Sequence, residues 1–196
     1  MAVKKNEGKI FEDNFQASVK GVDEKIFFTR VKDTFIPPDL RQRVKVTKND
    51  YDCMLFARSH LFTLELKSTK ENRFSFDESI IKQHQIDKLV EANTYDNIIS
   101  GFIMNFREPL NKVFFVPIQE FIDYQYIAQN QIKENKYKNK INKSSIPKGI
   151  CEEIGIEIKG FKKKVNWHYH IKDFITEAMN YKQQGGQINE HSKKQS

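Results

Sequence analysis

The stretch that decides the fold is Asp52-Cys-Met-Leu-Phe-Ala-Arg-Ser-His-Leu-Phe-Thr-Leu-Glu-Leu-Lys67. Two apolar runs flank a polar turn at residues 58–60, which predicts a β-hairpin with strands at 51–57 and 61–67. Side chains on a strand alternate between two faces. We therefore expect one face of the second strand to be core and the opposite face to be polar.

The polar face of the second strand carries candidate chemistry. Glu65 and Lys67 are two residues apart and share that face, and Asp52, at the start of the first strand, reaches the same place. Carboxylate oxygens suit Mg²⁺, and a lysine can orient a water or meet charge that develops on a phosphate. The pattern also arises by chance, as a solvated charge pair on a strand. Asp50 is a second possible ligand, although the apolar run directly after Asp52 favours Asp52.

Length and composition indicate one globular domain. The chain has 196 residues, of which 38% are apolar and 30% charged. We expect a single domain over 1–182 and a disordered tail over 183–196. No apolar run approaches the roughly 20 residues of a membrane span, and residues 1–7 lack a signal peptide's apolar segment, so a soluble, cytoplasmic protein without a membrane partner is expected. Cys53 and Cys151 form no Cys-x-x-Cys pair, so no disulfide framework or zinc ribbon is indicated.

The formal charge of +7 favours a polyanionic partner. Between residues 132 and 166 there are ten lysines against four glutamates, so most of the excess lies there. Residues 132–148 alternate Lys and Asn and predict a mobile, lysine-rich exposed segment. Contact with phosphates is one interpretation of it, and an ordinary solvated surface is the other.

Apolar spacing predicts an α/β fold with a mixed sheet flanked by helices. A capping-box signature, Ser75-x-x-Glu78, predicts the start of a helix that ends near Asn93. On the helix over 118–131 we expect Tyr126 on the inner side. Pro37-Pro38 interrupts regular structure at the centre of a loop over 32–49. The other expected elements are helices at 8–20 and 173–181 and strands at 25–31, 97–106, 112–118, 154–159 and 165–171.

Several motifs together resemble the PD-(D/E)xK nuclease superfamily, and within it the RecU-type Holliday junction resolvases of Gram-positive bacteria and their phages. They are Gly8-x-x-Phe11-Glu12, Asp52 with Glu65-x-Lys67, His84-Gln85 and Lys143-Ser-Ser-Ile-Pro147. The resemblance covers most of the chain. It implies a restriction-endonuclease-like core and a homodimer that makes two symmetric cuts in branched DNA during recombination and repair.

The same resemblance implies roles for individual residues. Asp52 and Glu65 correspond to the Mg²⁺ ligands, with Mn²⁺ as a substitute, and Glu12 to an additional acidic ligand. Lys67 corresponds to the residue that positions the attacking water, and Gln85 to a glutamine that contacts the DNA or that water. The implied reaction is phosphodiester hydrolysis that leaves a 5′-phosphate and a 3′-hydroxyl.

The loop over 32–49 is shorter than the stalk by which cellular members of that family enter the junction. A related nuclease with another DNA substrate, a DNA-binding protein of the same fold without catalysis, and a basic interaction module therefore stay open as alternatives. The residues expected to contact DNA are Arg41, Arg43, Lys45, Lys136, Lys138 and Lys140.

Overall fold

The computed structural model describes residues 6–31, 37, 39–40, 43 and 49–185. Its helices are α1 (Glu7–Lys20), α2 (Gln83–Asn93), α3 (Ile118–Gln129), α4 (Lys148–Ile154) and α5 (Ile171–Gln183). Its strands are β1 (Ile26–Arg30), β2 (Cys53–Ala57), β3 (His60–Thr69), β4 (Arg73–Ser75), β5 (Ile98–Phe106), β6 (Lys112–Pro117), β7 (Ser145–Pro147), β8 (Ile156–Glu157), β9 (Gly160–Lys163) and β10 (Asn166–Tyr169).

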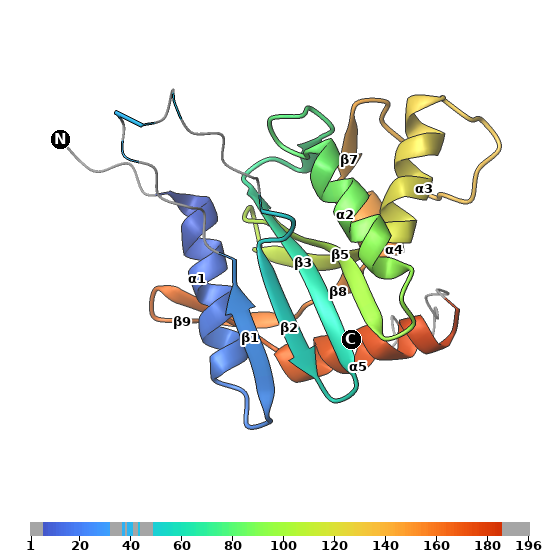
Figure 1. Cartoon of the computed structure of the whole chain (residues 1–196). Coiled ribbons are helices and arrows are strands. Elements are labelled where there is room, and N and C mark those ends of the chain that lie inside the picture. The colour runs from blue at the N-terminus through green and yellow to red at the C-terminus, as the bar shows by residue number, and fades with distance from the viewer. Residues whose placement is uncertain (1–5, 32–36, 38, 41–42, 44–48, 186–196) are drawn as a thin grey trace.

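A six-stranded sheet in the order β1-β2-β3-β5-β6-β8 forms the centre of the molecule (Figure 1). β3 and β5 run parallel, and the other neighbours in this sheet are antiparallel. A parallel pair needs a crossover connection, which α2 provides. The predicted fold class, α/β with a mixed central sheet flanked by helices, is confirmed.

Helices cover both faces of this sheet. On one face α1 and α5 bury an apolar cluster that includes Phe15, Leu64 and Phe174. On the other face α2, α3 and α4 bury a second cluster that includes Leu89 and Phe102. Because α2 lies over the face of β3 that sequence alternation assigned to polar chemistry, Thr63 and Glu65 on that face are buried and Lys67 is half-buried.

The helix predicted from Ser75-x-x-Glu78 begins later than expected. Ser75 ends β4, and the helix starts only at Gln83. The Ser75 hydroxyl accepts a hydrogen bond from the Asp77 amide at 3.1 Å, and the Glu78 carboxylate accepts one from the Gln83 amide at 2.9 Å. The two side chains therefore stabilise a turn and the start of α2 separately, instead of capping one helix together.

Three further expectations are corrected. Tyr126 is exposed, because Phe121 and Tyr124 form the inner side of α3 with Ile118 and Ala128. Residues 132–148 are not a purely exposed segment, since Tyr137 and Ile141 pack against the second apolar cluster and β7 pairs with β4. Residues 148–154 form a helix, α4, before the strand expected from 154, and the edge strand β9 was not predicted.

Residues 186–196 of the expected tail and most of the 32–49 loop lie outside the described residues. The predicted start of the tail is corrected, because Gln183 is the last residue of α5. A single domain over 1–182 stays a prediction. In the part of the chain that the structure describes, no helix has the length and apolar character needed to cross a membrane.

Candidate active site

Asp52 and Glu65 come together through strand pairing. Cys53 pairs with Leu64 in the β2–β3 hairpin, so Asp52, one residue earlier, lies at the level of Glu65. The Asp52 Oδ2 atom accepts a hydrogen bond of 2.8 Å from the backbone amide of Leu66. The hairpin therefore holds the carboxylate of Asp52, directly before β2, beside that of Glu65 in the second half of β3.

Glu65 is buried to a degree that is costly for a carboxylate. It is 2% exposed, and its Oε2 atom has no hydrogen-bond partner among the described residues. Burial and, next, the charge of Asp52 raise the pKa of Glu65 to about 8, while the ammonium of Lys67 acts in the opposite direction. The two carboxylates thus repel each other within a poorly solvated site.

Lys67 and Gln85 surround the other oxygen of Glu65. The Lys67 Nζ atom lies 2.9 Å from Glu65 Oε1 and donates a hydrogen bond of 3.2 Å to Gln85 Oε1. Gln85, buried on the first turn of α2, donates its amide to Glu65 Oε1. This places β3 and α2 side chains in one network, as the predicted crossing of the helix over the hairpin required.

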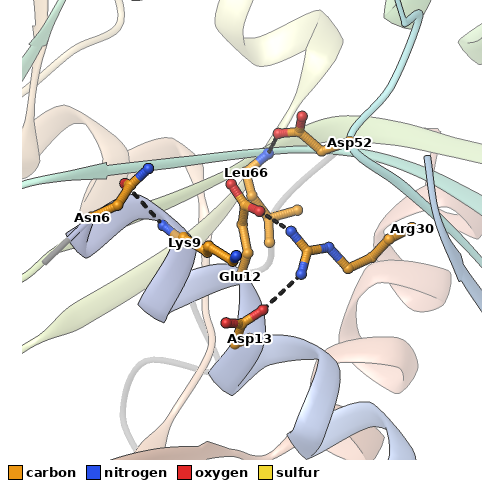
Figure 2. A network of polar contacts seen from close by, with 7 residues as sticks. All are labelled: Asn6, Lys9, Glu12, Asp13, Arg30, Asp52 and Leu66. Carbon is orange, nitrogen blue, oxygen red and sulfur yellow. Dashed lines mark hydrogen bonds and ion pairs between the residues drawn. The ribbon is translucent and has the colours of Figure 1, made fainter. Parts of the chain in front are cut away.

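Glu12 is the third carboxylate predicted for the site. It lies on α1 and forms an ion pair with Arg30, the last residue of β1, which also pairs with Asp13 at 2.7 Å. Figure 2 shows Glu12 reaching from α1 toward β3 at Leu66, the residue whose amide bonds Asp52. Arg30 was not predicted as a site residue, although its place at the end of an apolar strand was the available signal.

The donor set suits a divalent cation in part. Among the described residues no group of three or more His, Cys, Asp and Glu side chains is arranged to hold a metal ion. Asp52 and Glu65 nevertheless supply two hard oxygen donors, one of them the buried Glu65 Oε2 atom without a partner. A cation between the two carboxylates would remove their repulsion, so the pair fits Mg²⁺.

Asp50, the alternative ligand, is exposed, and its charge acts on Tyr51 and Lys88. Of the residues expected to contact DNA, Arg41 and Lys45 lie outside the described residues, and Arg43 and Lys140 are exposed. Lys136 forms an ion pair of 2.9 Å with Glu120, and the Lys138 amide bonds Glu153. The structure leaves the DNA role of these residues a prediction.

The chain is similar in sequence to a prophage protein over most of its length. The chain is 50% identical over 178 residues to YotM, a protein of Bacillus subtilis strain 168 derived from the SPbeta prophage, with 91% of this chain and 89% of YotM covered. The chain belongs to the YotM family. Because the match takes in 178 of the 196 residues, it spans the YotM region that corresponds to Asp52 through Gln85.

No family model matches the chain. Among solved structures it is similar to Hjc, a Holliday junction resolvase from the archaeal hyperthermophile Archaeoglobus fulgidus. The identity is 12% and the TM-score 0.41, over 77% of this chain and 92% of Hjc. A likeness of this size carries no inference about the chemistry of this chain.

Proposed function

We propose that the protein is a Mg²⁺-dependent, structure-selective DNA endonuclease that cuts four-way junctions in recombination and repair. The observation that carries the proposal is the buried Glu65, whose Oε2 atom lacks a hydrogen-bond partner among the described residues. Asp52 approaches it from the neighbouring strand, and the Lys67 ammonium lies 2.9 Å from its other oxygen. Two carboxylates and a lysine at one strand end suit metal-assisted hydrolysis of a phosphodiester.

Asp52 and Glu65 are the residues that would hold Mg²⁺, or Mn²⁺ in its place. Glu12 would be the additional acidic ligand. When bound, the metal ion would make a water acidic and offset negative charge on the phosphate. Lys67 is the proton-bearing group beside this pair. Its ammonium can orient the attacking water or stabilise charge on the phosphate oxygens.

Gln85 is a positioning residue in this proposal. Its amide contacts both Glu65 and Lys67, so it fixes the distance between the carboxylate and the ammonium. Since Gln85 is buried, we assign it to this internal role ahead of direct contact with DNA.

The prophage origin of YotM supports a phage setting, in which branched DNA is produced by recombination. A homodimer would present two identical sites to the two strands that must be cut. The junction preference rests on the resemblance of the sequence motifs to RecU-type resolvases. If the protein cuts a linear duplex of the same sequence as fast as it cuts the junction, the junction is not its preferred substrate, and the chain is a related nuclease with another DNA substrate.

The test is a cleavage assay on a labelled four-way junction with Mg²⁺, Mn²⁺, Ca²⁺ or EDTA. We expect cleavage with Mg²⁺ and Mn²⁺, and binding without cleavage in Ca²⁺. Lys67→Ala and Glu65→Ala should each lower the cleavage rate by about a hundredfold or more while junction binding persists. Gln83→Ala, an exposed position two residues before Gln85, is the matched control and should cut normally. Full activity in either site variant would contradict the proposal.

DNA binding without catalysis is the second candidate function. It is favoured by one observation, the ion pair in which Arg30 already supplies a counter-charge to Glu12, the third carboxylate. A protein of this kind would bind the junction in every metal condition and cut it in none.

A further inference from the structure

A polar cleft lies on the α1 side of the central sheet, near the carboxyl end of β3. It has a volume of about 530 Å³ and is bounded by the first half of α1, the turn after β5 and the β9–β10 hairpin. Three cations line it, namely Lys9, Arg107 and Lys162. The lining carboxylates are Glu7 and Asp13, and Asp13 is already paired with Arg30 at 2.7 Å. The cleft therefore has an excess of positive charge distributed over three elements.

Arg107 connects the cleft to the candidate site. Its backbone amide donates to the carbonyl of Thr69, the last residue of β3, and its guanidinium donates to the Ser68 hydroxyl at 3.2 Å. Ser68 directly follows Lys67 along β3. Because side chains alternate along β3, Ser68 lies on the α1 side of the sheet and Lys67 on the α2 side. The cleft thus begins at the carboxyl end of β3, on the opposite face of the sheet from Glu65 and Lys67.

Two polar groups in the cleft are available for a ligand. In the part of the chain that the structure describes, no carboxylate lies within ion-pair distance of Arg107, and the half-buried guanidinium contacts only the Ser68 hydroxyl. Asn14 is 7% exposed, and no described residue hydrogen-bonds its side-chain amide. A guanidinium without a carboxylate partner and an amide that faces the cleft are donors that suit an oxygen-rich anion.

The wall of the cleft is held by a chain of hydrogen bonds. Ser68 donates to Asn105 at 2.9 Å, Asn105 to Asn111 at 2.9 Å, and Asn111 to the Tyr169 hydroxyl at 3.4 Å. Tyr169 is buried on β10 against Phe11 of α1. This chain fixes the turn that carries Arg107 against the hairpin that carries Lys162, so the cations are held on a built surface.

We propose that this cleft binds the sugar-phosphate backbone of DNA next to the phosphate that is cut, with Arg107 as the main phosphate ligand. Lys9 and Lys162, both exposed, contact flanking phosphates. An extended polyanion suits cations on three elements better than a single compact anion does, and phosphate contacts set the position of a nuclease on DNA. The inference rests on the proposed function in that the DNA passes from the cleft around the carboxyl end of β3 to Glu65 and Lys67.

The experiment measures binding apart from cleavage. Fluorescence anisotropy of a labelled duplex and a labelled four-way junction is recorded in Ca²⁺ and in EDTA over a salt series. Arg107→Gln should weaken binding about tenfold and reduce the slope of log K against log salt by about 0.9, the value for one phosphate contact on duplex DNA. Arg107→Lys should restore the slope while recovering only part of the affinity, because lysine keeps the charge and loses the guanidinium geometry.

Arg58→Gln is the matched control. Arg58 lies in the turn between β2 and β3, where it forms an ion pair with Glu24. This turn is about 30 Å from Thr69 along β3. Binding and slope should equal those of the unsubstituted protein. Thermal unfolding of each variant shows that it is folded.

The outcomes separate this inference from the proposed function. Weaker, less salt-sensitive binding by Arg107→Gln supports the cleft even if the protein cuts no DNA with Mg²⁺. If folded Arg107→Gln binds with unchanged affinity and salt slope, the cleft does not bind the DNA backbone, even if the protein cuts DNA. Displacement of the duplex by a deoxynucleoside monophosphate at equal nucleotide concentration would also overturn it, since a free nucleotide would then be the ligand.

Discussion

Glu65 is the residue on which the proposed chemistry depends. A buried carboxylate without a partner on one oxygen costs stability, and the neighbouring Asp52 increases that cost. Lys67 and Gln85 offset part of it through the other oxygen. A bound cation would offset this cost, because both carboxylates would then have a counter-charge.

The pH dependence of stability gives a prediction for Glu65. Its pKa is raised to about 8 in the folded protein, above the ordinary value of 4.5. Between these values the folded state binds a proton that the unfolded state has lost, so the free energy of unfolding falls as pH rises and levels off above about 8. Glu65→Gln removes this linkage. We expect the wild type to lose up to about 4 kcal/mol more than the variant between about pH 5 and about pH 8 in EDTA.

Urea unfolding at a series of pH values measures this difference. Glu71→Gln, at an exposed position after β3, is the control and should retain the wild-type pH dependence. Mg²⁺ added at the upper pH should raise the stability of the wild type and leave Glu65→Gln unchanged, which reports binding without any activity assay. Equal pH slopes in wild type and Glu65→Gln would rule out the raised pKa.

How far these residues follow from the sequence depends on the geometry that relates them. Alternation along β3 placed Glu65 and Lys67 on one face, and the short hairpin brought Asp52 beside them, because both relations are local. The approach of Gln85 was expected from the crossover helix. The Glu12–Arg30 ion pair was not predicted, since it depends on how α1 packs against β1, which no local pattern specifies.

At the scale of elements, β5 is the strand against which the hairpin is fixed. Gly101 of β5 pairs with Leu64 on one side and Pro117 on the other, and the ring of Phe115 occupies the space next to its Cα. A Cβ atom at Gly101 would meet the carbonyl oxygen of Val116 and lie 2.7 Å from the Phe115 ring. The absence of a side chain here is a packing requirement.

Gly101→Ala should therefore lower the free energy of unfolding by about 3 kcal/mol, as measured by urea denaturation. Gly8→Ala is the control, because its Cβ would meet only Asn6 Oδ1 at 3.4 Å on the first turn of α1. That variant should be as stable as the wild type or more stable by up to about 1 kcal/mol. A Gly101→Ala protein of wild-type stability would show that β6 can move away from β5.

Long elements with strong apolar patterns were predictable, and short elements were not. The nine-residue strand β5 and the fourteen-residue helix α1 were predicted nearly to the residue. The predicted start of α2 was wrong, because free backbone amides occur in turns as well as at the start of a helix. Ser75 accepts a hydrogen bond from such an amide in a turn, and Glu78 accepts one at the start of α2. The Lys-Asn segment was judged on composition, whereas Tyr137 and Ile141 attach it to the core through contacts that are distant in sequence.

At the scale of the whole molecule, one part of the central sheet is left uncovered by the described helices. Phe27 of β1 is 62% exposed and Phe56 of β2 is 46% exposed, and the two residues pair directly across the strands. Their neighbours Ile26, Phe28 and Leu55 face the opposite side, against the cluster that α1 and α5 cover. Adjacent exposed aromatic residues on a sheet face form an apolar surface that a protein partner can bury.

If the proposed function holds, we expect this face to form the proposed homodimer. Phe27→Lys with Phe56→Lys should convert the dimer to a monomer, because two buried charges would oppose each other across a two-fold axis, and light scattering after size exclusion measures the mass. Tyr95→Lys, which changes an equally exposed aromatic in the turn after α2, should stay dimeric. The monomeric double variant should nick one strand of a junction without the paired cut, since its site at Glu65 is intact. A monomeric wild type would contradict the homodimer, and a dimer that persists in the double variant would show that another surface forms the interface.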